Sequence, residues 1–212
     1  MFNPYFLSYT ILFSGLIALG STIALLGPVE AQFLLGEAGP IERASALGYF
    51  LCAGYMLASG GGSFVKKYSY IIVLILLFGC RELDFDKRFT TMGILKSRFY
   101  LSPDVGVLEK VIGLFIIALL LWAIFKTVKH HAASTLSGLT QLTERAIGVV
   151  AIFGLLVVSK SIDGLARKLE PFGIETSAEV SFVTGAAEEV MELGIPILMI
   201  IVFHSWLQNR NE

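Results

Sequence analysis

The sequence predicts an all-α integral membrane protein, built as a bundle of about six transmembrane helices. Of the 212 residues, 55% are hydrophobic and only 16% are charged. Soluble domains contain about 45–50% apolar and about 25% charged residues, so the composition excludes a soluble globular protein. A spanning helix needs about 20 apolar residues, and six such stretches would place roughly 120 residues in lipid. We therefore expect one transmembrane helical domain over residues 1–212.

Proline and glycine separate the first three expected spans. Residues 5–27 form the first span and end at Pro28, which cannot continue a helix. The second span covers residues 41–59 and is followed by three consecutive glycines at 60–62, which favour a flexible turn. The third span covers residues 68–87, where an apolar beginning changes abruptly to the polar run CRELDFDKR.

The fourth, fifth and sixth expected spans cover residues 105–128, 146–166 and 180–207. Residues 89–101, between the third and fourth spans, mix aromatic, aliphatic and basic side chains. This composition suits an amphipathic interfacial helix or a re-entrant lid, and it suits an ordinary loop equally well. A lid would let a lipid-like molecule enter laterally toward the charged residues of the spans.

An even number of spans places both termini on one side of the membrane. The bases expected on that side are Lys66, Lys67, Lys126, Lys129, Arg145 and Arg210, and the acids are Glu144 and Glu212. More bases fall in the opposite half of the chain, but most of them lie within spans beside acids that would neutralise them. Since Lys and Arg in short loops favour the cytoplasm, we expect both termini to be cytoplasmic and the chain to lie in the inner membrane.

Charged side chains are expected at similar depth in three of the spans. Arg81, Lys160 and Glu192 lie roughly 16–21 Å along their helices, near or beyond the middle of the bilayer. A lone charge at that depth costs at least about 2.5–3.5 kcal/mol, so these groups should face the bundle interior. In and beside the spans, eight acids balance eight bases. We expect charge pairs, including one made by Arg81, to hold the third, fifth and sixth spans in register.

Helical spacing groups these charges into stripes. Lys160, Asp163 and Arg167 follow i, i+3, i+7 on the fifth span, and Glu188 and Glu192 follow i, i+4 on the sixth. On the third span, Arg81, Asp84 and Arg88 are expected to share one face, while Glu82 and Asp86 share another. Like charges at the spacing of the glutamates repel each other. One of these carboxylates should therefore be protonated or hold a cation.

These stripes provide the candidate site residues. The candidate catalytic residues are Glu188, Glu189, Glu192, Glu82 and Asp86. The candidate substrate-binding residues are Arg81, Arg88, Lys160, Asp163 and Arg167. The arginines of this set, Arg81, Arg88 and Arg167, are expected to hold an anionic head group, because guanidinium groups pair well with such anions. A purely structural role, in which the charges only fix helix packing, stays open.

Carboxylate oxygens suit a hard cation, so Mg, Ca or Mn is one candidate cofactor. The three histidines, His130, His131 and His204, lie away from the glutamates in sequence. A zinc ion ligated by histidine, or a haem, is therefore not expected beside the acids. The net charge of −1 provides no basic field for a nucleic acid partner.

Three acidic motifs resemble those of uncharacterised bacterial multi-pass inner-membrane proteins. They are the Gly-Pro-x-Glu-Arg run at 39–43, the Arg-Glu-x-Asp-Phe run at 81–85 and the Glu-Glu-x-x-Glu-Leu run at 188–193. The resemblance implies a bacterial inner membrane and implies no reaction.

The sequence favours a protein that binds or processes a charged amphipathic, lipid-like molecule in the outer half of the bilayer. A proton- or cation-coupled translocator is an alternative, because carboxylates lie deep in the spans beside Lys160. A third interpretation is an accessory subunit that docks a membrane-protein partner through its charges. Whether the chain is an enzyme stays open at this point.

Overall fold

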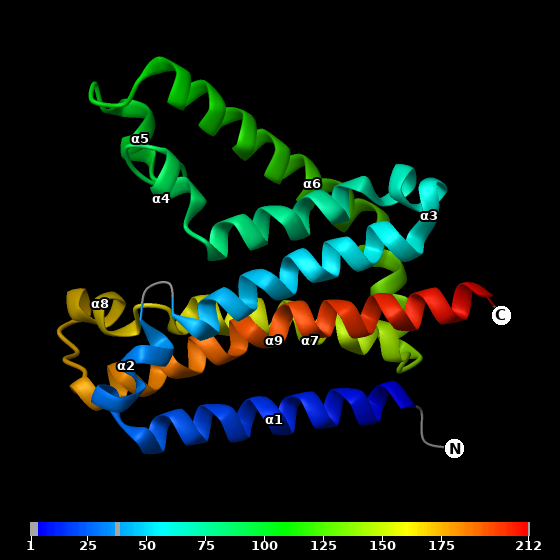
Figure 1. The fold of residues 1–212 in the computed structure, drawn as a ribbon, viewed down its shortest axis with the longest axis horizontal. Helices are drawn as coiled ribbons and strands as arrows, with labels where there is room; N and C mark the ends of the chain where they lie inside the picture. Colours follow the sequence, from blue (N-terminus) through cyan, green and yellow to red (C-terminus); the bar gives the residue numbers. More distant parts are fainter. Residues whose placement is uncertain (1–3, 37–38, 212) are drawn as a thin grey trace.

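The computed structural model describes residues 4–36 and 39–211, with side chains up to Asn209. Its described residues form helices and short connections, without a strand among them (Figure 1). In chain order the helices are α1 (Pro4–Leu26), α2 (Pro28–Leu35), α3 (Pro40–Glu82), α4 (Phe85–Phe89), α5 (Ser97–Leu101), α6 (Val107–Thr140), α7 (Glu144–Ile162), α8 (Leu165–Leu169), the 3-10 helix η1 (Glu170–Phe172) and α9 (Ala178–Asn211).

The predicted all-helical architecture is confirmed. Five helices among the described residues are long and apolar enough to cross a membrane, namely Pro4–Leu26, Pro28–Glu82, Val107–Thr140, Glu144–Ile162 and Ala178–Asn209. Large apolar side chains are exposed on their outer faces, such as Ile17 on α1 and Phe115 on α6. Faces of this kind are compatible with contact to lipid.

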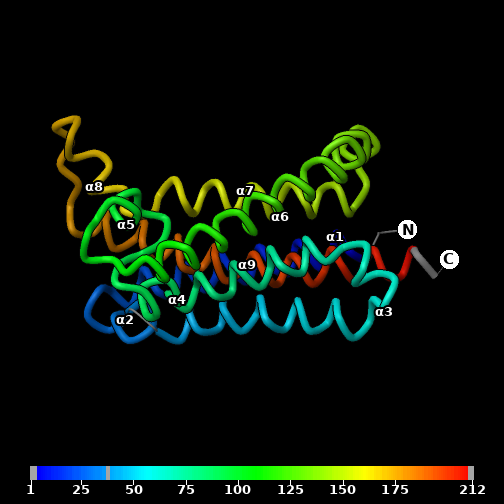
Figure 2. The backbone as a smooth tube through the Cα atoms, turned by 90° about the horizontal axis from the view of Figure 1, so that it is seen from above, coloured from blue at the N-terminus to red at the C-terminus, as the bar shows by residue number. Residues whose placement is uncertain are grey.

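Helix α3 contains the second and third expected spans, and the chain reverses direction between them. Gly61 interrupts the helix with φ 74° and ψ 169°, a backbone conformation that glycine adopts without steric cost. Figures 1 and 2 show the two arms of α3 running antiparallel on either side of this turn. The two arms pack closely at Gly79. A Cβ atom added there would lie only 3.1 Å from Cβ of Tyr49, so a larger residue would not fit without a shift.

Helix α9 lies at the centre of the bundle, where it contacts α1, α2, α3, α7 and α8. Its packing against α3 is tight, since a Cβ atom added at Gly48 would lie 2.8 Å from Cγ of Pro196. Proline has no backbone N–H, so Pro196 cannot donate the helical hydrogen bond to the carbonyl of Glu192. The core around this contact includes Tyr49 and Ile195.

The bundle has two distinct ends. Helix α1 begins and α9 ends at the same end, which also holds the α3 reversal and the α6–α7 connection; we call it the terminal end (Figures 1 and 2). The short helices α2, α4, α5 and α8 lie at the other end, which we call the cavity end. At the terminal end, Tyr9 donates a hydrogen bond to the carbonyl of Glu144 at 3.0 Å. The Tyr55 hydroxyl lies 2.7 Å from Nδ1 of His204.

Two helices end earlier than predicted, and these ends change which side chains share a face. Helix α3 ends at Glu82, and Asp84 adopts the left-handed conformation with φ 50°. Helix α7 ends at Ile162, and Gly164 is left-handed with φ 58°. Because the chain changes direction at both points, the expected stripes do not continue as far as Arg88 and Arg167.

The connection between α3 and α6 contains α4, a series of turns and α5. Phe99 is fully buried, and a Cβ atom added at Gly113 of α6 would lie 2.9 Å from its ring. The backbone N–H of Thr91 donates to Oε2 of Glu109 at 2.8 Å. The connection is therefore anchored to the first turns of α6.

Candidate functional site

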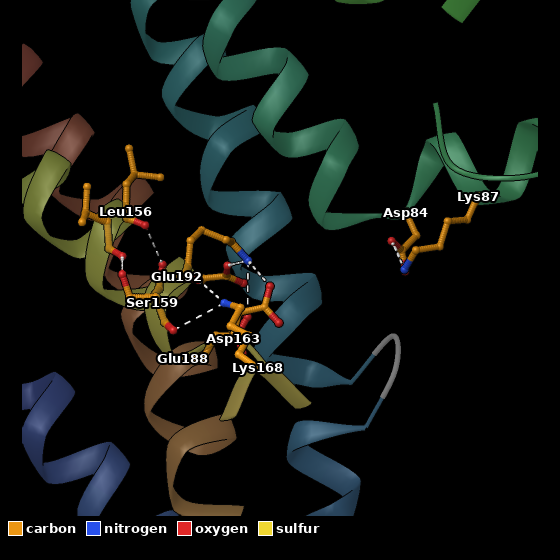
Figure 3. A network of polar contacts seen from close by, with 11 residues as sticks. Asp84, Lys87, Leu156, Ser159, Asp163, Lys168, Glu188 and Glu192 are labelled. Carbon is orange, nitrogen blue, oxygen red and sulfur yellow. Dashed lines mark hydrogen bonds and ion pairs between the residues drawn. The ribbon is translucent and has the colours of Figure 1, made fainter. Parts of the chain in front are cut away.

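A lysine links helices α7 and α9 near the cavity end. Lys160 Nζ lies 2.5 Å from Oε1 of Glu192, 3.3 Å from Oε1 of Glu188 and 3.5 Å from Oδ2 of Asp163. Figure 3 shows these three carboxylates gathered around one ammonium group. The Glu192 side chain is only 11% exposed, so its charge is compensated mainly by Lys160.

The chain after α7 folds back onto the end of that helix. Lys168 Nζ donates to the carbonyl of Lys160 at 2.7 Å. A lysine at this place satisfies a carbonyl that has no partner in the last turn of a helix. Lys160 is therefore fixed at two points, since its carbonyl accepts a hydrogen bond from Lys168 and its ammonium group pairs with Glu192.

A cavity of about 680 Å³ lies beside this lysine. Its polar lining includes all six acids that the sequence singled out as site residues, namely Glu82, Asp86, Asp163, Glu188, Glu189 and Glu192. Its apolar wall includes Phe78 of α3, Phe85 and Phe89 of α4, and Ile112, Ile116 and Leu120 of α6. The cavity is therefore amphipathic, because its lining combines carboxylates with aliphatic and aromatic side chains.

Glu82 is the most buried carboxylate of the cavity without a close partner. It is 9% exposed and lines the cavity. Among the described residues, it makes no hydrogen bond or ion pair within 4.0 Å, and the same holds for Glu189. A buried charge without a partner is energetically costly, so either a proton or a positively charged group near Glu82 would lower this cost.

Eight of the ten predicted site residues line the cavity, and two do not. Arg81, Lys160 and the acids named above are brought together. Arg88 and Arg167 are exposed and absent from the lining. The reason is the early end of α3 and α7, which turns the following residues away from the helix faces on which the sequence placed them.

The cavity also contains charged residues that were not predicted as site residues. They are Glu42, Asp84, Lys87 and Glu109. Asp84 and Lys87 pair at 2.7 Å, away from the Lys160 cluster (Figure 3). Glu42 and Glu109 lie in the first turns of α3 and α6. An acid in a first turn is favoured by the helix dipole, and this signal could have placed both at one end of the bundle.

The lining is acidic, which corrects the expected balance of charges. Nine carboxylates and three basic side chains line the cavity within the described part of the chain. The expected pair between Arg81 and a carboxylate is not found among those residues either, because no ion pair within 4.0 Å involves Arg81. The ion pairs that join α7 to α9 are made by Lys160 instead, with Glu188 and Glu192.

The geometry gives no support to the hypothesis of a hard cation shared by the glutamates. Over residues 4–36 and 39–209, no group of three or more His, Cys, Asp or Glu side chains is placed to hold a metal ion. Two of the histidines hydrogen-bond to tyrosines, with His131 Nε2 lying 2.8 Å from the hydroxyl of Tyr70.

Comparisons with protein-family models, with curated proteins and with solved structures found no match to this chain.

Proposed function

We propose that the chain is a multi-pass protein of a bacterial inner membrane that binds or processes a charged amphipathic, lipid-like molecule in this cavity. The observation that carries the proposal is the presence of carboxylates and aliphatic side chains in the lining of one cavity. Its volume of about 680 Å³ lies within the range of about 300–1,000 Å³ that small-molecule sites occupy.

The membrane topology that goes with this function has six spans in a single domain. The antiparallel arms of α3 on either side of Gly61 support two crossings within that helix. Six crossings agree with the common position of the start of α1 and the end of α9. Lys66 and Lys67 follow the reversal at Gly61, and Arg145 lies in the first turn of α7, so these bases belong to the terminal end. The positive-inside rule therefore favours a cytoplasmic location for that end.

In this arrangement the cavity lies in the outer half of the bilayer, and α4, α5 and the turns between them lie near the outer interface. Phe89 and Leu95 are exposed on this connection and also line the cavity. They provide an apolar route by which a lipid-like molecule could enter from the membrane.

The proposal is tested by binding of amphiphiles to the full chain in phosphatidylcholine nanodiscs. The probes share a fluorescent dodecyl chain and carry an ammonium or a phosphate head. Ile116→Trp fills the apolar wall and should weaken binding of whichever probe the protein holds. Leu114→Trp, on an exposed position of the same helix, should not. Absence of saturable binding by every probe would contradict the proposed function.

A proton- or cation-coupled translocator is the second candidate, and the Lys160–Glu192 pair favours it. Ionisable pairs within spans often mark ion pathways. In proteoliposomes, this function requires that an imposed pH or cation gradient drives uptake of the ammonium probe. Uptake that does not respond to the gradient would reject the coupled translocator and favour a protein that only binds or processes the amphiphile.

A further inference from the structure

We propose that the molecule held in the cavity carries a positively charged head, such as an alkylamine or a quaternary ammonium amphiphile. This inference rests on the proposed function and specifies its ligand class. It replaces the anionic head group that the sequence suggested, because two of the three arginines expected to bind that group do not line the cavity.

The charges of the lining favour a cation. Two of the three bases are already neutralised, Lys160 by Glu192 and Lys87 by Asp84. Arg81 is the remaining base of the described lining, and its side chain is exposed. An anionic head would therefore face many carboxylates and a single base without an ion pair.

Glu82 is the carboxylate that we expect the ammonium head group to contact. This side chain lines the cavity, is nine-tenths buried, and makes no hydrogen bond or ion pair within 4.0 Å among the described residues. Glu189 on α9 also lines the cavity without an ion pair of that length. An ammonium group between them would compensate both charges at once.

The apolar wall shows that a bare inorganic cation or a small amine would use only part of the cavity. Ile112, Ile116, Ile117 and Leu120 occupy one side of α6. Their positions extend over about 12 Å along the helix. A surface of this length matches an alkyl chain attached to the head group.

The experiment compares heads on a constant chain. The full-length protein in phosphatidylcholine nanodiscs is loaded with the fluorescent dodecylammonium probe, and empty nanodiscs provide the background. The competitors are dodecyltrimethylammonium, dodecylphosphocholine, dodecyl phosphate and dodecanol. We expect dodecyltrimethylammonium to displace the probe at about tenfold lower concentration than dodecyl phosphate or dodecanol, which corresponds to about 1.4 kcal/mol.

Two variants test the sign of the charge. Glu82→Gln should weaken binding of the ammonium probe about tenfold, whereas Glu179→Gln, an exposed acid of α9 outside the cavity, should leave it unchanged. Arg81→Gln should strengthen ammonium binding, because it removes a like charge. An anionic head would show the opposite response to Arg81→Gln. This exposed position also provides a test that is independent of whether Glu82→Gln folds.

The outcomes separate this inference from the proposed function. Preferential displacement by dodecyl phosphate, dodecylphosphocholine or dodecanol, or weaker ammonium binding in Arg81→Gln, overturns the cationic head and leaves an amphiphile site. Failure of all heads to bind in a saturable manner overturns the proposed function itself.

Discussion

Lys160 Nζ on α7 lies 2.5 Å from Glu192 Oε1 on α9, and this ion pair joins the two helices at the polar wall of the cavity. The lysine also lies within 3.5 Å of oxygens of Glu188 and Asp163. One base thus holds three acids from two segments of the chain. Loss of this base would leave Glu192 buried without its partner and would change the charge of the cavity lining.

Replacing Lys160 by methionine is expected to destabilise the protein. The change leaves Glu192 buried without its partner, a loss on the order of 3 kcal/mol, at the lower end of the usual range because Lys160 is 33% exposed. Thermal unfolding of the purified protein in detergent measures the effect.

Lys66→Met is the matched control, because Lys66 is exposed at the terminal end. Adding Glu192→Gln to Lys160→Met should restore part of the lost stability, since the second change removes the uncompensated charge. An unfolding temperature of Lys160→Met equal to that of Lys66→Met would show that the pair contributes nothing to stability.

Gly148→Ala is expected to weaken the packing of α7. A Cβ atom at this position would clash with the Tyr9 hydroxyl and with Cγ2 of Val202. Such overpacking costs about 1–3 kcal/mol. Gly154 of the same helix has open space around it, so Gly154→Ala should stabilise the helix by up to about 1 kcal/mol. Thermal unfolding of the two variants should shift in opposite directions, and equal shifts would contradict the close contact.

Phe99→Ala is expected to loosen the connection between α3 and α6. The Phe99 side chain is fully buried against α6, and its truncation costs about 3–5 kcal/mol of local packing. Limited proteolysis should then cleave residues 90–106 faster. Leu101→Ala serves as the control because Leu101 is 82% exposed. Unchanged cleavage of Phe99→Ala would mean that other contacts anchor this segment.

Reporter fusions test the six-span topology. Fusions at residue 212 and within residues 126–145 should both report a cytoplasmic location, whereas fusions at Asp104 and Glu175 should report the outer side. An N-terminal reporter on the side opposite to residue 212 would indicate an odd number of spans.

The apolar stretches predicted the helical architecture well. Apolar length and composition identify helices, and the glycines at 60–62 coincide with the reversal in α3, where Gly61 has a positive φ. The α6 helix extends to Thr140, beyond the expected end of the span at residue 128. Its final turns are polar but contain no residue that stops a helix before Gly138, so hydropathy alone underestimated its length.

The end of α3 near the site could not be predicted from periodicity, whereas Gly164 after α7 was a signal for the end of that helix. Asp84 takes a positive φ, which is uncommon for a residue other than glycine, and the sequence has no strong helix breaker there. Arg88 and Arg167 each follow a helix end and do not line the cavity, although Asp86, which follows the same end as Arg88, does. All six predicted site acids line the cavity, but only two of the four predicted bases do. The net negative charge of the lining could therefore be recognised only from the tertiary structure.

The missing hydrogen bond between Pro196 and the carbonyl of Glu192 divides the hydrogen-bond ladder of α9 one turn from a residue of the cavity lining. Beyond it, Phe203 and Trp206 stack, and Ser205 donates a hydrogen bond to Glu144, which holds the terminal half in place. The other half carries the glutamates and packs through Val190 in one cluster with Leu16 and Ile23 of α1. The cavity glutamates and the contacts to α1 therefore lie on one side of Pro196 along α9, and the contact of Ser205 with Glu144 lies on the other.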